Sequence, residues 1–535
     1  MPLVQQFLAQ IRQQVQEQRG DLLRAWLQIE PNAPQQYHAM AAELQAEVTG
    51  PDVHQQLGQL VDKALPQDED VAEGEATAWP SLQTFIRDYL VLWRDIDHDN
   101  VLQSHELLTT VVNSCGTAFT HPQYGAMLLD LCMSLCESLA RFTLRLHRQP
   151  NLTRHLRARD EDGASKSIAE SSAEIIQKFF KTCLMDRAAG HRPEGKKVGV
   201  YMFANLVLKL LFACKKTNLA SMIFRNMSAS SPPLRLYPAS QRVTYLYYLG
   251  RFNFATSHYL RAALCLQQAY LQTPSRFVSH RANILTYLVP SNMLLGRFPS
   301  AQLACRPEAE ALMPILMPLC DAVRAGDFAR FQHHLAAHDA WLLEKGLYLQ
   351  LCFRLRPLLW RSLARRTFLL TYIAPNVDDS RRAATLDLAH LLTTARFLQR
   401  RIEGWIPASQ LVRDRPFPHH VNSLYLKAVT GNVHQPPDTS LIPPPGGARS
   451  LTPYQGLVCG NRDITLQDIE MTITALIRQE LMHGFVAHGQ ARFAIIGAKA
   501  KGPVLAGWPS PWQAIQERRY DDNFDPLNVP GWVRV

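Results

Sequence analysis

Apolar residues at helical spacing cover most of this 535-residue chain. Between Tyr245 and Pro274 they form two helical segments that are joined by a short turn. The residues are small at Gly250 and Ala262, where the two helices would have to approach closely. Because Pro274 cannot continue a helix, we expect the second segment to end just before it.

These positions have the spacing of a repeated helix pair. The offsets typical of a tetratricopeptide-type repeat are occupied by Leu249-Gly250, Ala262, Leu266, Ala269 and Pro274. Leu266 and Ala269 would then lie on the inward face of the second helix. A single helix pair cannot bury its own apolar face, so we expect further pairs to be stacked on both sides.

Helical spacing does predict more helices on either side. The expected segments are 1–66, 81–93, 101–113, 124–146, 166–185, 201–212, 313–325, 328–338, 341–355 and 357–373. Charged or Pro-containing stretches separate several of them, and these are interpreted as links. This part of the sequence therefore predicts an array of helix pairs.

The pattern changes after residue 375. An amphipathic helix is expected from about Ala384 to Ile402, and residues 403–463 are rich in Pro and Gly, which is typical of an irregular insertion. The next helix is expected from Thr465 to His483, with Asp468 completing a capping box.

Two short apolar runs follow, 485–487 and 492–496. They flank His488-Gly489-Gln490, and the sequence predicts a small hairpin whose turn needs Gly. Helices followed by a two-stranded hairpin are typical of a winged helix. The predicted fold is therefore mostly α, an α-solenoid of tetratricopeptide-like helix pairs that ends in a winged helix.

The predicted organisation has four parts. They are an N-terminal helical extension (1–165), a helical-repeat part (166–375), a winged helix with an irregular insertion at 403–463 (376–502), and a C-terminal tail (503–535). In the tail, Trp508 and Trp512 are expected to pack back on the winged helix rather than to anchor a partner.

Composition narrows the class of protein. Hydrophobic residues make up 47% of the chain, and neither an apolar run of about 20 residues nor a basic-then-apolar leader is present, so we expect a soluble, non-secreted protein. The ten cysteines form no CxxC pair and are interpreted as reduced thiols. A formal charge of +10 suits a polyanionic partner.

Candidate chemistry is sparse. The segment from Asp95 to Glu106 has carboxylates at positions 1, 3, 5 and 12 of a calcium-binding loop, but Asn100 stands where Gly is usual. The alternative is an acidic helix start, capped by Asp99 or Asn100. His333-His334 and His419-His420 are adjacent rather than four residues apart, and phosphate-loop and nucleophile-elbow motifs are absent. We therefore expect no enzyme activity and no cofactor.

Several segments also resemble a known family. YYLGRFNF, ILTYLVPSNMLLGRFPS, KGLYLQL, ITLQDIE and HGFVAHGQARFAII, in this order from about Tyr201 to Ile496, look like the Thp/PCI-domain-containing family. A helical array that runs directly into a winged helix is the PCI domain. The chain departs from the family pattern at 403–463, and residues 1–150 match less clearly. The signalosome-associated twelfth-subunit-like branch is a close relative that shares much of the pattern.

The resemblance implies a function. Members of that family pair with a GANP/Sac-type PCI scaffold and a small acidic Dss/Sem protein in the second transcription-export (TREX) complex. That complex couples transcription to mRNA export at the nuclear pore, which implies a nuclear location. The alternative is a signalosome-associated or splicing-linked subunit that does not bind nucleic acid directly. We expect that the protein neither binds a membrane nor acts on a small-molecule substrate.

The basic residues provide candidate sites. Weak, sequence-tolerant RNA or DNA binding through phosphate contacts is predicted for Arg396, Arg400, Arg401, Arg478, His488, Arg492, Lys499 and Lys501. The alternative is that the winged helix serves assembly alone. Partner contacts are predicted for Arg354, Arg361, Arg365 and Ile495. The arginines among them belong to a basic edge with Arg356 and Arg366, whose alternative interpretation is a solvated helix face.

Overall fold

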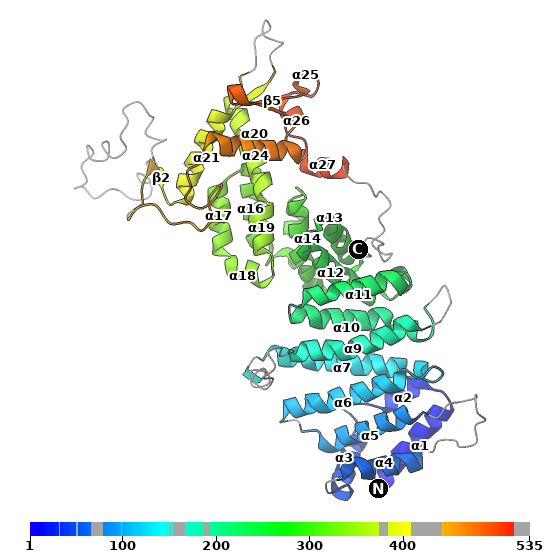
Figure 1. The fold of residues 1–535 in the computed structure, drawn as a ribbon. Coiled ribbons are helices and arrows are strands. Elements are labelled where there is room, and N and C mark those ends of the chain that lie inside the picture. The colour runs from blue at the N-terminus through cyan, green and yellow to red at the C-terminus, as the bar shows by residue number, and fades with distance from the viewer. Residues whose placement is uncertain are drawn as a thin grey trace. The chain divides into compact units, whose positions relative to one another are not determined.

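A computed structural model describes most of the chain, and it is mostly α-helical, as predicted (Figure 1). The described residues are 1–30, 33–49, 52–65, 79–97, 99–149, 151–152, 166–186, 193–373, 383–407, 441–444 and 446–517. Within them, no helix is long and apolar enough to cross a membrane. The described residues form two compact units, which divide after Phe252.

The first unit is built of helices. In chain order they are α1 (Pro2–Gln16), α2 (Gly20–Trp26), α3 (Gln35–Glu47), α4 (Val53–Ala64), α5 (Pro80–Asp95), α6 (Val101–Phe119), α7 (Leu129–His147), α9 (Ile168–Met185), α10 (Val200–Ala213), α11 (Thr217–Ser230) and α12 (Ala239–Ala255). From α5 to α11, helices that follow one another in this order pack side by side, apart from short connecting turns. Helices are confirmed at the predicted segments 81–93, 101–113, 166–185 and 201–212. The described part of 1–66 is divided into α1 to α4, α7 begins at Leu129 rather than at 124, and α11 is not among the predicted helices.

Aromatic side chains from different helices pack against one another in the core of this unit. Phe7 of α1 stacks on Trp26 and on Tyr89, with ring centroids 5.8 and 5.9 Å apart. Further along, Phe179 of α9 stacks on Phe203 of α10 at 5.5 Å. Such rings bury large areas, so the packing of their faces holds successive helices together.

The second unit adds strands. Its helices are α13 (Tyr259–Gln272), α14 (Val278–Leu294), α15 (Ala301–Ala304), α16 (Met313–Ala325), α17 (Phe328–Ala337), α18 (Asp339–Glu344), α19 (Tyr348–Arg354), α20 (Arg356–Thr371), α21 (Leu388–Ile402), α24 (Leu466–Arg478), α25 (Ala498–Lys501), α26 (Pro503–Gly507) and α27 (Pro511–Glu517). Its strands are β1 (Thr385–Asp387), β2 (Ile406–Pro407), β3 (Leu441–Ile442), β4 (Gly484–Ala487) and β5 (Arg492–Ile495).

Two helices, α12 and α13, are present where the sequence predicts them at 245–274. Leu249, Ala262, Leu266 and Ala269 are buried, and α13 ends two residues before Pro274, as predicted. The division between the two compact units falls inside α12, after Phe252.

One predicted helix is wrong. The segment 341–355 was expected to be continuous, but α18 ends at Glu344 and α19 begins at Tyr348. Gly346 lies between them with φ of +70°, the left-handed conformation that favours glycine and ends helices. The apolar spacing carries on across this break, which is why the sequence pattern suggested one helix.

The winged helix has a third strand that the sequence did not reveal. β1 pairs antiparallel with β5, and β5 pairs with β4, so the strand order is β1-β5-β4. Leu386 of β1 is fully buried opposite Phe493. Three residues are too few to show the alternation that marks a strand, and they were assigned to the start of the following helix.

The irregular insertion is described only at its two ends. β2 and β3 pair antiparallel there, with Ile406 opposite Ile442. Residues 446–464 form turns that lead into α24. The rest of the predicted insertion, 408–440, lies outside the described residues.

Candidate winged-helix surface

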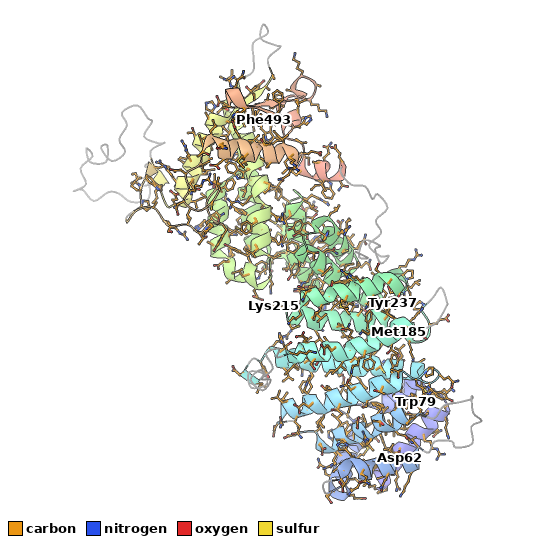
Figure 2. The ribbon with its side chains drawn as sticks, in the orientation of Figure 1. Asp62, Trp79, Met185, Lys215, Tyr237 and Phe493 are labelled. Carbon is orange, nitrogen blue, oxygen red and sulfur yellow. The ribbon has the colours of Figure 1, made fainter. Side chains whose placement is uncertain are left out.

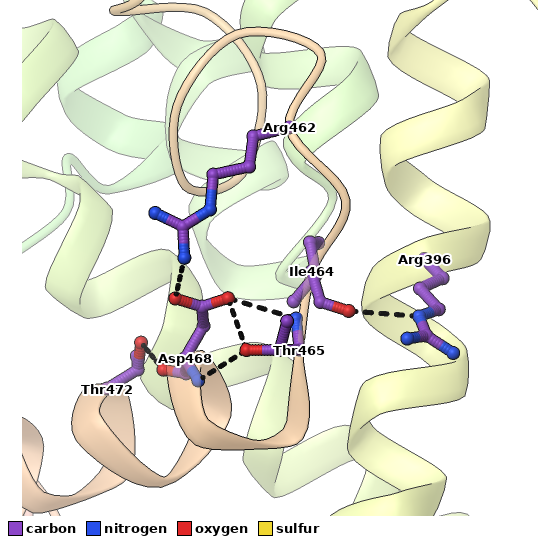
Figure 3. Close-up of polar contacts among 6 residues, drawn as sticks. All are labelled: Arg396, Arg462, Ile464, Thr465, Asp468 and Thr472. Carbon is purple, nitrogen blue, oxygen red and sulfur yellow. Dashed lines mark hydrogen bonds and ion pairs between the residues drawn. The ribbon is translucent and has the colours of Figure 1, made fainter.

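A capping box fixes the start of α24 (Figure 3). The Asp468 amide donates to Thr465 Oγ1 at 3.2 Å, and the Thr465 amide donates to Asp468 Oδ2 at 3.0 Å. Arg462 adds an ion pair to the same carboxylate at 2.8 Å. Hydrogen bonds from Thr465, aided by Arg462, lower the pKa of Asp468. The predicted capping box is thus confirmed.

Helix α24 is also tied to α21. The Arg396 Nε donates to the Ile464 carbonyl oxygen at 3.0 Å, just before the capping box. Ile469, Ile473 and Leu476 turn inward and are buried, as expected from their spacing. The helix ends at Arg478 rather than at His483, because Glu480 takes a left-handed conformation with φ of +57°.

The outer face of α24 is more apolar than that of a recognition helix that binds in the major groove of DNA. Gln467, Thr474 and Arg478 are exposed there, whereas Glu470 is half-buried. Met471 is 66% exposed on the same helix, and Phe485 of β4 is 56% exposed. Because this face carries one cation, α24 can make few electrostatic contacts to nucleic-acid phosphates.

The wing turn differs from its prediction. The left-handed residue is Ala491, with φ of +48°, and Gly489 does not have a positive φ. The glycine that the wing requires is Gly484, because a Cβ there would lie 2.1 Å from the Ala494 carbonyl oxygen across the strand pair. At the tip, His488 Nδ1 lies 2.7 Å from Glu470 Oε2, which joins the wing to α24.

Five of the eight predicted nucleic-acid residues fall into two groups. Arg492 on β5 and the lysines Lys499 and Lys501 of α25 are exposed. On α21, Arg400 lies 5.0 Å from the Trp405 ring, and Arg401 donates to the Trp405 carbonyl oxygen at 3.5 Å. The α21 arginines therefore also hold the chain that follows their helix.

The basic edge on α19 and α20 is divided. Arg354 and Arg365 are exposed, whereas Arg361 is half-buried. The Arg361 guanidinium donates to the carbonyl oxygens of Leu481, Trp508 and Pro509 at 3.2, 3.0 and 2.7 Å. Burial lowers the pKa of Arg361 to about 10. This side chain thus joins α20 to the end of the winged helix and to the tail.

Arg356, five residues before Arg361 on α20, likewise donates to three backbone carbonyl oxygens. Its guanidinium donates to the carbonyl oxygens of Tyr454, Gly456 and Leu457, at 3.1, 2.6 and 2.6 Å. The Gln399 side chain holds the same turn segment through the Gly460 carbonyl oxygen and the Leu457 amide. The middle of the turn segment before α24, residues 454–460, is therefore held by α20 and α21.

The tail packs on the winged helix through one of its two tryptophans. Trp508 is buried against Phe368 of α20 and Phe493 of β5, with ring centroids 4.9 and 6.0 Å apart. Trp512 lies instead under the Arg297 guanidinium, 4.5 Å from its ring centroid. The fourth predicted partner residue, Ile495, is 4% exposed and lies against Gly507, while Ile496 beside it is exposed.

The other candidate motifs are described in part. Asn100 Oδ1 accepts from the Gln103 amide at 3.2 Å and caps α6, the alternative interpretation of the acidic segment. His98 and the pair His419-His420 lie outside the described residues. Within the described part of the chain, His, Cys, Asp and Glu side chains form no group of three that could hold a metal ion.

Helix pairs that lead into a winged helix define a PCI-type fold, and comparison with known proteins agrees with this class. The chain is 28% identical to a PCI domain-containing protein of Schizosaccharomyces pombe over 296 residues, which are 54% of this chain and 64% of that protein. No family model matches the chain.

Two further relatives carry more specific names. The chain is 28% identical to the PCI domain-containing protein 2 homolog of Drosophila melanogaster over 43% of its own length and 54% of that protein. It is 30% identical to the Protein CSN12 homolog of Neurospora crassa over 39% of its length and 46% of that protein. The matches thus span about half to just under two thirds of these relatives.

Proposed function

We propose that this chain is a non-catalytic scaffold subunit of a nuclear, transcription-coupled mRNA export complex. It would pair with a GANP/Sac-type PCI scaffold and with a small acidic Dss/Sem protein at the nuclear pore. The observation that carries the proposal is the winged helix at the end of a helical array, together with similarity to proteins named for the PCI domain.

The winged-helix surface suits assembly with a limited contribution to nucleic-acid binding. Exposed Met471 and Phe485 favour a protein contact on α24 and β4, because exposed apolar side chains gain from being covered. The exposed cations Arg492, Lys499 and Lys501 can meet phosphates without reading bases. RNA or DNA binding by this surface would be weak and completed by the partner.

A second function has nearly equal support. Similarity to a Protein CSN12 homolog favours a signalosome-associated or splicing-linked PCI subunit that does not bind nucleic acid directly. Both functions share the fold and differ in their partners.

Affinity purification of the full chain from nuclear extract, followed by mass spectrometry, distinguishes the two. Recovery of a GANP/Sac-type scaffold and a small acidic protein is the expected result. Recovery of signalosome subunits without that scaffold would select the alternative. Turnover of a nucleotide or peptide substrate by the purified chain would contradict both.

A further inference from the structure

A long part of this chain contains no acidic residue. Between Gly195 and Pro307 there is neither Asp nor Glu, although 46 acidic residues in 535 would place about ten in a stretch of this length. The first unit contains nine cations of this stretch: Lys196, Lys197, Lys209, Lys215, Lys216, Arg225, Arg235, Arg242 and Arg251. An excess of positive charge over successive helices attracts polyanions.

Several of these cations meet at one edge of the first unit. The end of α12 lies beside the end of α10, because the Arg251 guanidinium is 4.8 Å from the Phe212 ring centroid. The end of α7 lies there too, since His147 Nε2 is 3.1 Å from the Ala213 carbonyl oxygen. Figure 2 labels Lys215 at this edge, in the turn between α10 and α11.

We name this group the cationic edge, and it consists of Arg148, Lys209, Lys215, Lys216 and Arg251. All but Arg251 are exposed, and Arg251 is half-buried. Lys209 precedes Phe212 by three residues on α10, so the two side chains lie on the same helix face. The Lys216 ammonium is 3.8 Å from Glu170 of α9, a carboxylate that is 13% exposed, so one of the charges is partly neutralised.

Aromatic rings accompany these charges. Arg251 and Tyr247 are one helical turn apart on α12, and the guanidinium lies 5.5 Å from the Tyr247 ring centroid. The Tyr247 ring is half-buried, so part of it faces solvent beside the cations. Single-stranded nucleic acids are bound by this combination, in which cations track phosphates while bases stack on aromatic rings or on guanidinium planes.

We propose that the cationic edge binds the phosphodiester backbone of single-stranded RNA, as a site separate from the winged helix. The exposed lysines would contact successive phosphates, and Tyr247 with Arg251 would offer a base a surface to stack on. An acidic protein segment would use the charges but not the rings. The proposal does not depend on which complex the chain joins.

The test is RNA binding by the full chain, measured as fluorescence anisotropy of a labelled oligouridylate of about 20 nucleotides at several salt concentrations. The variant Lys209→Gln/Lys215→Gln/Lys216→Gln removes three exposed charges. We expect binding on the order of tenfold weaker at about 0.1 M salt. We also expect the slope of log affinity against log salt to fall by about 2, as for three lost contacts to a single strand.

The matched control is Lys178→Gln/Lys181→Gln/Arg235→Gln. It removes the same charge from exposed positions that lie away from the cationic edge, two on the later part of α9 and one on the connection between α11 and α12. We expect this control to change RNA affinity less than about twofold. Thermal unfolding followed by circular dichroism checks that both variants fold.

Three outcomes would overturn the proposal. One is equal loss in the test and control variants, which would assign the effect to net charge. A second is polyglutamate of matched charge competing as well as RNA, which would assign the edge to an acidic protein segment. A third is loss confined to the winged-helix variant Arg492→Glu/Lys499→Glu/Lys501→Glu, which would support the proposed winged-helix surface and contradict a role for the cationic edge.

Discussion

At the residue scale, arginines of one sequence segment have two different environments. Arg354 and Arg365 are exposed, whereas Arg356 and Arg361 each donate to three backbone carbonyl oxygens. A guanidinium carries five N–H donors in a rigid fork, which lets one side chain join several chain segments. The positive charge alone does not distinguish the two environments.

Replacing Arg361 with Ala should destabilise the second unit by about 2–3 kcal/mol, because three carbonyl oxygens lose a charged donor. The measurement is the urea unfolding midpoint, with proteolysis of the tail as a second readout. Arg365→Ala, at an exposed position, should change stability by less than about 0.5 kcal/mol. Equal effects of the two variants would contradict the structural role of Arg361.

His105 should make the first unit sensitive to acid. Burial lowers the pKa of His105 to about 4 from its ordinary value of 6.5, and its Nε2 lies 3.0 Å from Thr143 Oγ1. Between these pH values the unfolded state binds a proton that the folded state does not, so stability should fall as the pH drops from 6.5 to 4, by up to about 3 kcal/mol.

The variant His105→Gln removes this titration and keeps a polar side chain near Thr143. We expect the difference in acid sensitivity between the two proteins to appear in hydrogen exchange of α6 and α7 at pH 7 and pH 5. Identical pH dependence in the wild type and the variant would show that His105 is not the responsible group.

At the element scale, helix ends were the least predictable feature, and α24 shows why. Its beginning was predicted because Thr465 and Asp468 form a local signal that needs only neighbouring residues. Its end depends on Glu480 adopting a left-handed backbone, which the sequence does not mark. The same holds at the wing, where Ala491 rather than Gly489 takes that conformation.

The capping box gives a prediction for α24. Asp468→Asn should destabilise the winged helix by about 1 kcal/mol near neutral pH. Because the pKa of Asp468 is lowered from its ordinary value of 3.8, the stabilisation is fully present above pH 3.8 and is lost as the pH falls through the lower folded pKa. The two proteins should therefore converge in urea midpoint in strong acid, and a constant difference would contradict this.

At the scale of the whole molecule, the exposed wing cations should matter most in an assembled complex. Arg492→Glu/Lys499→Glu/Lys501→Glu should weaken RNA binding by the complex and reduce its salt dependence, because three phosphate contacts become repulsive. The measurement is a salt titration of affinity for the chain with its copurified partners. Unchanged affinity would show that this face does not bind nucleic acid, and its proposed role would then be protein assembly alone.

The sequence by itself determined the order of the helices, the capping box of α24 and the two wing strands. These features depend on periodicity and on contacts between near neighbours, which a linear pattern records. The tertiary structure decided which charges are exposed, that Trp508 packs on Phe493 while Trp512 lies under Arg297, and that β1 completes the sheet. Those outcomes depend on residues far apart in the chain: the acceptors of Arg361 lie more than 100 positions away, and no local pattern carries that information.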